Sequence, residues 1–144
     1  EPMMESHRML LFFTPLIAAM AGNVGVQSSA IVVQGLANNS ITGSLWNRLL
    51  KELSLSLLNG SILAGILILG SHFLLGYEFI IGITVSIALL SVIVIASLIG
   101  TFIPIVLDKY GVDPALATGP FITTSNDIIG IIIYFTIAKL VLGI

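Results

Sequence analysis

The sequence predicts an all-α, polytopic membrane helix bundle with four long helices. Hydrophobic residues make up 57% of the 144 residues and charged residues only 8%, whereas an ordinary soluble domain carries about 25% charged residues. The apolar residues fall into four stretches, each at or above the ~20 residues that cross a bilayer as a helix. These stretches are residues 9–36, 49–75, 79–107 and 115–144. Because they lack the alternating pattern of barrel strands, only helices can satisfy their backbone groups in lipid.

The first stretch is expected to be a mature helix rather than a signal peptide. Its apolar run contains Pro15 and Asn23 and does not end in a cleavage site. A polar connector at residues 38–44 then leads to the second helix, which begins with Arg48, Lys51 and Glu52. The remaining connectors are residues 72–78 and 108–113. We read His72 and Glu78 in the former as a solvated loop at the membrane edge.

Positive charge in short loops predicts the orientation of the helices. Arg48 and Lys51 adjoin the first connector and Lys109 lies in the third, while the second connector has no Lys or Arg. The first and third connectors are therefore expected to be cytoplasmic, and the start of the first helix to be outside. A chain that begins outside without a signal sequence suggests that a further helix precedes it.

Asp127 is the candidate functional residue of the fourth stretch. It lies about 13 residues into that stretch, or roughly 20 Å along a helix. Burial of an aspartate at a helix centre costs roughly 2.5 to 3.5 kcal/mol, so such residues usually face a bundle interior or a wet pathway. Helical spacing puts it on a small or polar stripe that resembles a pore wall, made of Gly119, Thr123, Asp127, Gly130 and Tyr134. The structural alternative is a protonated or hydrogen-bonded aspartate between helices.

Two further features accompany Asp127. We expect Pro120 to free the carbonyl of Leu116 inside the fourth helix and to turn backbone oxygen toward a cavity. The first stretch carries a small-residue face that lets helices approach closely, made of Ala18, Gly22, Gly25 and Ser29. A neighbouring face is largely amide, and it either presents oxygens to a hydrated ion or bonds an adjacent helix. That face comprises Ala19, Asn23, Gln27 and Gln34.

Several classes of function have no support in the residues. The chain has no cysteine and shows no nucleophile–base pair, phosphate loop or histidine metal cluster, so we expect no catalytic residue and no enzyme. A net charge of -2 gives no basic patch for nucleic acid. The expected surroundings are the lipid bilayer of the cell membrane.

These residues resemble the membrane domain of the MgtE family of magnesium channels. The resemblance rests on the run from Pro15 to Gln27, with Gly22, Asn23 and Gly25, and on the run from Asp113 to Gly130, with Pro120 and Asp127. Lys51, Glu52, Leu53 and Gly60 also match in pattern. The resemblance covers essentially all of residues 1–144, which would form the transmembrane pore domain. A first membrane helix and a cytoplasmic regulatory sensor domain, both typical of the family, are expected to lie outside this chain.

The resemblance implies a homodimer whose ion path follows the two-fold axis and is lined by the first and fourth stretches. It assigns the central metal site to Asp127, path-lining positions to Ala19, Asn23, Gly119 and Thr123, and close helix packing to Gly22 and Gly25. Bacterial members can carry Asn at the Gly119 position and Ala at the Thr123 position, so this chain departs from the pattern there.

The physics agrees with Mg2+ as the transported ion and ligand, since Mg2+ keeps several waters and prefers one or two carboxylates. The leading hypothesis is therefore a channel that conducts Mg2+ down its electrochemical gradient. The alternative is a secondary cation transporter coupled to H+ or Na+, with Asp127 as the ion carrier. A third interpretation is a non-conducting anchor that dimerises through the small-residue face of the first helix.

Overall fold

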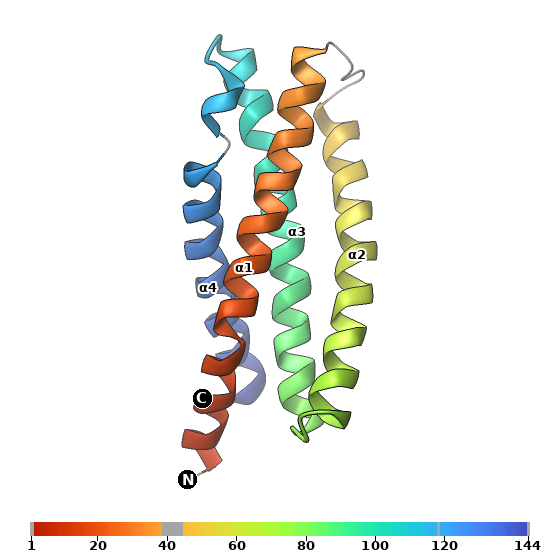
Figure 1. Cartoon of the computed structure of the whole chain (residues 1–144), viewed down its shortest axis with the longest axis vertical. Coiled ribbons are helices and arrows are strands. Elements are labelled where there is room, and N and C mark those ends of the chain that lie inside the picture. Colours follow the sequence, from red (N-terminus) through yellow and green to blue (C-terminus); the bar gives the residue numbers. More distant parts are fainter. Residues whose placement is uncertain (1, 39–44, 118, 144) are drawn as a thin grey trace.

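The chain folds into a bundle of four long α-helices, as the sequence predicts. The computed structural model describes residues 2–38, 45–117 and 119–143, in which consecutive α-helices run antiparallel (Figure 1). Residues 39–44 of the expected first connector lie outside the described part. The elements in chain order are α1 (Pro2–Ala37), α2 (Leu45–Phe73), α3 (Phe79–Lys109), the short 3-10 helix η1 (Pro114–Ala117) and α4 (Pro120–Leu142).

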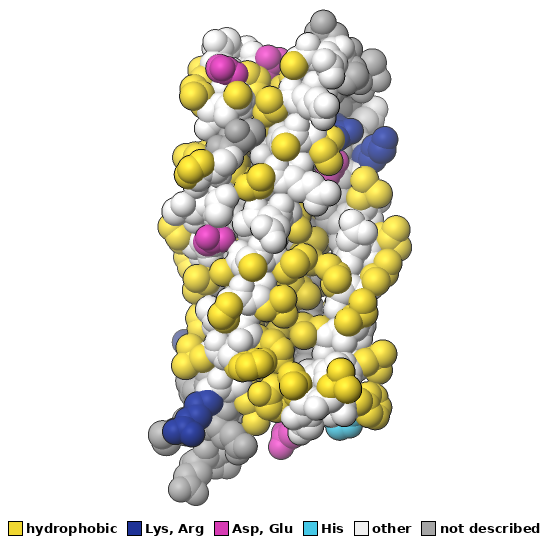
Figure 2. All heavy atoms as spheres, in the orientation of Figure 1, with side chains coloured by type: hydrophobic (Ala, Val, Ile, Leu, Met, Phe, Trp, Pro, Cys, Tyr) yellow, Lys and Arg dark blue, Asp and Glu magenta, His cyan; other side chains and the backbone are white. Residues whose placement is uncertain are grey.

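All four α-helices are long and apolar enough to cross a membrane. Their apolar surface is not confined to the interior, since Phe12, Leu58 and Ile132 are each about 60% exposed. Figure 2 shows apolar side chains along the visible face and most Lys and Arg side chains toward its two ends. Hydrocarbon is the solvent that such a surface requires. The candidate spans are Arg8–Ala37, Asn47–Phe73, Phe79–Lys109 and Pro120–Leu142.

Helix α3 is the centre of the bundle, because α1, α2 and α4 all pack against it. Helix α1 also packs against α4. Within the described residues, α2 packs closely against α3 alone, and no Cα atom of α2 lies within 8 Å of one in α1. The buried apolar core lies where α1, α3 and α4 meet, and its largest member, Tyr134, donates a hydrogen bond to the Leu10 carbonyl at 2.6 Å.

Small and hydroxyl residues hold α2 against α3. Ser56 and Ser97 form a short hydrogen bond between the two helices, and the Ser86 hydroxyl donates to the Ala64 carbonyl at 3.1 Å. A Cβ on Gly60 would collide with the Leu90 side chain, so this glycine lets the helices approach closely. Close packing over small residues, with hydroxyl hydrogen bonds, replaces hydrophobic burial as the source of helix association in lipid.

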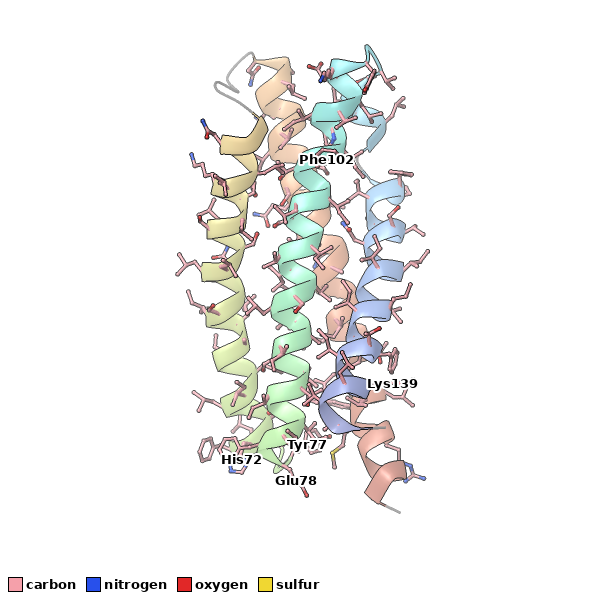
Figure 3. All side chains as sticks on the ribbon, turned by 180° about the vertical axis from the view of Figure 1, so that it is seen from behind. His72, Tyr77, Glu78, Phe102 and Lys139 are labelled. Atoms are coloured by element: carbon pink, nitrogen blue, oxygen red, sulfur yellow. The ribbon has the colours of Figure 1, made fainter. Side chains whose placement is uncertain are left out.

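The two ends of the bundle differ in the residues they carry. The end of α1, the start of α2 and the end of α3 lie at one end, together with Arg48, Lys51 and Lys109, while the start of α1 and the end of α4 lie at the other end (Figure 1). Figure 3 shows His72, Tyr77 and Glu78 at that second end, with Lys139 toward it. The His72 ring stacks on Phe79 with centroids 3.7 Å apart, and its Nδ1 lies 2.9 Å from the Tyr77 carbonyl oxygen.

The fourth helix begins later than the sequence suggested. We expected residues 115–144 to form one helix with Pro120 inside it, but η1 ends at Ala117 and α4 starts at Pro120. The expectation of a proline-broken helix with a freed Leu116 carbonyl is therefore wrong. Pro120 occupies the first turn, where a helix has no need of its N–H and where its fixed φ suits the helix start.

Candidate functional site

Asp127 lies on α4 with its side chain partly buried. It follows Pro120 by seven residues, which places it roughly 10 Å from the start of the helix. This is about half the depth expected from a helix beginning at residue 115. The carboxylate remains inside the membrane-spanning segment Pro120–Leu142, where a charged group needs water, a counter-ion or a polar neighbour.

Gly22 on α1 lies directly against the Asp127 side chain. A Cβ built on Gly22 would lie 3.0 Å from Asp127 Oδ1 and 3.2 Å from Thr123 Cγ2. The absence of a side chain at position 22 therefore makes room for both residues. The α1 backbone thus forms one wall of the space into which Asp127 and Thr123 project.

Gly25, one turn further along α1, lies against Asn126 of α4. Asn126 was not among the residues predicted for the site. A Cβ on Gly25 would overlap Nδ2 of Asn126 and would lie 2.9 Å from Ile122 Cγ2. Asn126 is only 1% exposed, and neither its Oδ1 nor its Nδ2 has a hydrogen-bond partner in the described part of the chain. A signal was present in the sequence, because Ile122, Asn126 and Gly130 recur at steps of four on one helix face.

The amide face of α1 is open, whereas its small-residue face is packed. Ala19 and Asn23 are exposed, and no described helix covers them. Gly22 and Gly25 on the adjacent face are buried against α4. Because the small-residue face is used within one chain, it is not free to serve as the dimerisation surface of a simple anchor.

The polar stripe expected along α4 is partly open and partly buried. Gly130 packs against Ala21 and Val92, and Tyr134 is fully buried, so neither belongs to an open wall. Thr123 and Asp127 are the partly exposed members. The expectation of one continuous pore wall is wrong at positions 130 and 134, because both positions face the interior of the bundle.

Gly119 immediately precedes α4 and is not part of the helix. Its backbone has φ +68° and ψ -135°, a conformation that residues with a Cβ rarely adopt, and its carbonyl accepts a hydrogen bond from the Thr123 N–H at 3.0 Å. A Cβ at this position would meet no other atom within 4 Å. Backbone conformation, rather than lack of space, is therefore what favours glycine here.

Residues 14–137 match the family model described as "MgtE: Divalent cation transporter". The chain belongs to the MgtE family. Three proteins named magnesium transporter MgtE are similar to it: one from Bacillus subtilis (38% identical, 90% of this chain), one from Enterococcus faecalis (36%, 97%) and one from Thermus thermophilus (32%, 99%). The matches cover 29%, 31% and 31% of those relatives, so this MgtE-family chain spans less than a third of their length.

Membership in the MgtE family agrees with the resemblance read from the sequence and with a multi-pass protein of the cell membrane. The described residues contain no group of three His, Cys, Asp or Glu side chains that could hold a metal ion.

The unpartnered amide of Asn126 leads to a stability prediction. Replacement by leucine, of similar size, should raise the free energy of unfolding by about 1–3 kcal/mol, because a buried polar group without a partner carries a desolvation cost of that order. Thermal unfolding in detergent measures the change. Asn126→Ala is the control, since it removes the amide but leaves a void and should gain less. A lower melting temperature for Asn126→Leu would show that the amide is satisfied in the membrane.

Proposed function

We propose that this chain is the ion-conducting membrane part of a magnesium channel, in which Mg2+ passes Asp127 down its electrochemical gradient. The observation that carries the proposal is the partly buried Asp127 carboxylate, which lies inside a membrane-spanning helix beside the bare backbone of Gly22. Thr123 shares this space, and exposed Asn23 follows Gly22 on α1. The relatives named magnesium transporters support Mg2+ as the cargo.

A second copy of the chain would complete the site. One carboxylate is a small ligand set for a metal ion. The small and polar residues exposed or partly exposed on α1 and α4 must also be shielded from lipid. They include Ala19, Asn23, Thr123 and Asp127. A homodimer with this surface at its two-fold axis would bring two Asp127 carboxylates together around a hydrated ion. Two carboxylates and retained waters are the coordination that Mg2+ favours. The cytoplasmic regulatory domain expected for the full-length protein belongs to the same proposal.

The membrane potential can drive Mg2+ across the membrane without a coupled ion or nucleotide. A divalent ion gains about 4.6 kcal/mol per 100 mV, twice the figure for one elementary charge. One observation favours the alternative of a coupled carrier, namely the break between η1 and α4 at Gly119, because discontinuous helices line the binding sites of many secondary transporters.

Planar-bilayer recording separates the two functions. A channel should give Mg2+ currents that reverse at the Mg2+ equilibrium potential and do not change when a proton or Na+ gradient is imposed. Asp127→Asn, recorded in parallel, controls for leak around the protein. Flux that requires a proton or Na+ gradient and produces no unitary current would replace the channel with the carrier.

A further inference from the structure

A groove lies between α1 and α2, with α3 as its floor. Figure 1 shows the three helices that border it. It exists because α1 and α2 are well separated in the described part of the chain, where none of their Cα atoms come within 8 Å of each other. The cavity within it has a volume of about 380 Å³. At about 30 Å³ for each water in the liquid, this is room for roughly a dozen waters.

The groove carries several polar side chains among an otherwise apolar lining. Its walls include six side chains that offer oxygen atoms: Gln27 and Ser28 from α1, Glu52, Ser56 and Asn59 from α2, and Ser97 from α3. Lipid tails cannot hydrate such groups, so polar side chains at membrane depth face water or a polar partner. The composition of the walls therefore indicates a hydrated space.

Glu52 is the charged residue of the groove, and its ion pair is incomplete. Glu52 is 9% exposed, and its Oε1 lies 3.2 Å from Arg48 Nη2 one turn earlier on α2. The Nε of Arg48 is buried and has no hydrogen-bond partner among the described residues. Strong guanidinium–carboxylate pairs are usually bidentate, so this single contact leaves Arg48 poorly satisfied. A long arginine side chain can withdraw toward the bundle end when another cation takes its place.

The groove reaches the level of Asp127 on the opposite side of α1. Its α1 wall extends from Met20 to Ile31, a range that includes Gly22, the residue that lies against Asp127. Gln27 lines the groove and lies four residues from exposed Asn23, so the two amides stand on neighbouring turns of the helix. An ion in the groove would thus be separated from the Asp127 face by the width of one helix.

We infer that this groove is a second cation site, in which the Glu52 carboxylate, with the amide oxygens of Gln27 and Asn59, binds a hydrated divalent cation and displaces Arg48. The inference rests on the proposed function for the identity of the ion. It adds a site that is separate from Asp127. The oxygen-bearing side chains of the groove and its volume suit an ion that keeps its waters.

Mn2+ binding, measured by electron paramagnetic resonance on the chain in lipid nanodiscs, tests the inference. Asp127→Asn removes the pathway site, and this variant should still bind one Mn2+ per chain. Addition of Glu52→Gln should abolish that remaining site. Arg48→Met should have the opposite effect and tighten Mn2+ binding about tenfold, because it removes the cation that competes for the carboxylate.

The opposite effects of Glu52→Gln and Arg48→Met on Mn2+ affinity separate a binding site from a merely structural ion pair. If the pair only stabilises α2, loss of either partner changes stability and neither change tightens Mn2+ binding, which would overturn the inference. Asn59→Leu, at an exposed position, weakens binding without the risk that an unpaired Arg48 unfolds the chain. Glu78→Gln, an exposed carboxylate at the other end of the bundle, is the matched control and should bind as the parent does.

The remaining outcomes also decide between the two proposals. If Asp127→Asn binds no Mn2+, the groove is not a cation site, and the same result is expected if a second copy of the chain fills it. If Mn2+ binding follows Glu52 while Asp127→Ala leaves Mg2+ flux unchanged, the groove site stands and the proposed pathway falls.

Discussion

Replacement of Asp127 by alanine is expected to reduce Mg2+ flux into liposomes to the level of protein-free vesicles. A divalent ion about 6 Å from one carboxylate gains about 5 kcal/mol at an effective dielectric constant of 20. Loss of that energy corresponds to more than a thousandfold in an equilibrium constant. A Mg2+-sensitive dye trapped inside the liposomes reports the flux.

The matched controls for Asp127 separate charge from shape. Asp127→Asn keeps the size of the side chain and removes the charge, so it should lose flux as alanine does. Asp108→Asn makes the same change at an exposed position near the end of α3 and should leave flux intact. Normal flux through a folded Asp127→Ala chain would remove this carboxylate from the pathway.

Substitution of Gly25 by valine should have the largest effect on stability. The new Cβ would overlap the Asn126 amide on α4, and Gly100 of α3 packs closely against the Gly25 carbonyl from another side. Helices α1 and α4 would have to move apart while α3 holds α1 from the other side, and overpacking of this kind costs about 3 kcal/mol or more. Thermal unfolding monitored by circular dichroism should show a markedly lower midpoint.

Gly65→Val is the control for that experiment, because a Cβ on this α2 glycine meets no atom within 4 Å. It carries the same change in helix propensity without the clash. A second variant tests the cause, since Asn126→Ala should recover part of the stability lost in Gly25→Val. Equal midpoints for Gly25→Val and Gly65→Val would contradict the packing described for α1 and α4.

The helices of this chain could be predicted because their evidence is local. Continuous apolar runs and the polar residues at their ends placed α2 and α3 within a few residues of their bounds. The start of α4 was missed because Pro120 is compatible both with a kink inside a helix and with a first turn. Only the conformation of Gly119 decides between them.

Single residues of the candidate site could be predicted from the sequence, but the contacts between them could not. Asp127 stands out as a charge in an apolar segment, whereas Asn126 is informative only once Gly25 is known to lie against it. Residues at steps of three and four drift around a helix, so the stripe through Asp127 turned from open surface to core at Gly130. The groove at Glu52 depends on the separation of α1 from α2, which no local pattern encodes.

Water access to the face shared by Asp127, Thr123 and Asn23 tests the central claim most directly. The chain has no cysteine, so single cysteines can be placed at will. Thr123→Cys and Asn23→Cys in reconstituted chain should react rapidly with a membrane-impermeant thiol reagent. Ile132→Cys, which is 61% exposed on α4 but apolar in its surroundings, should react slowly. Protection of positions 23 and 123, or equal reaction at position 132, would contradict a water-filled path along this face.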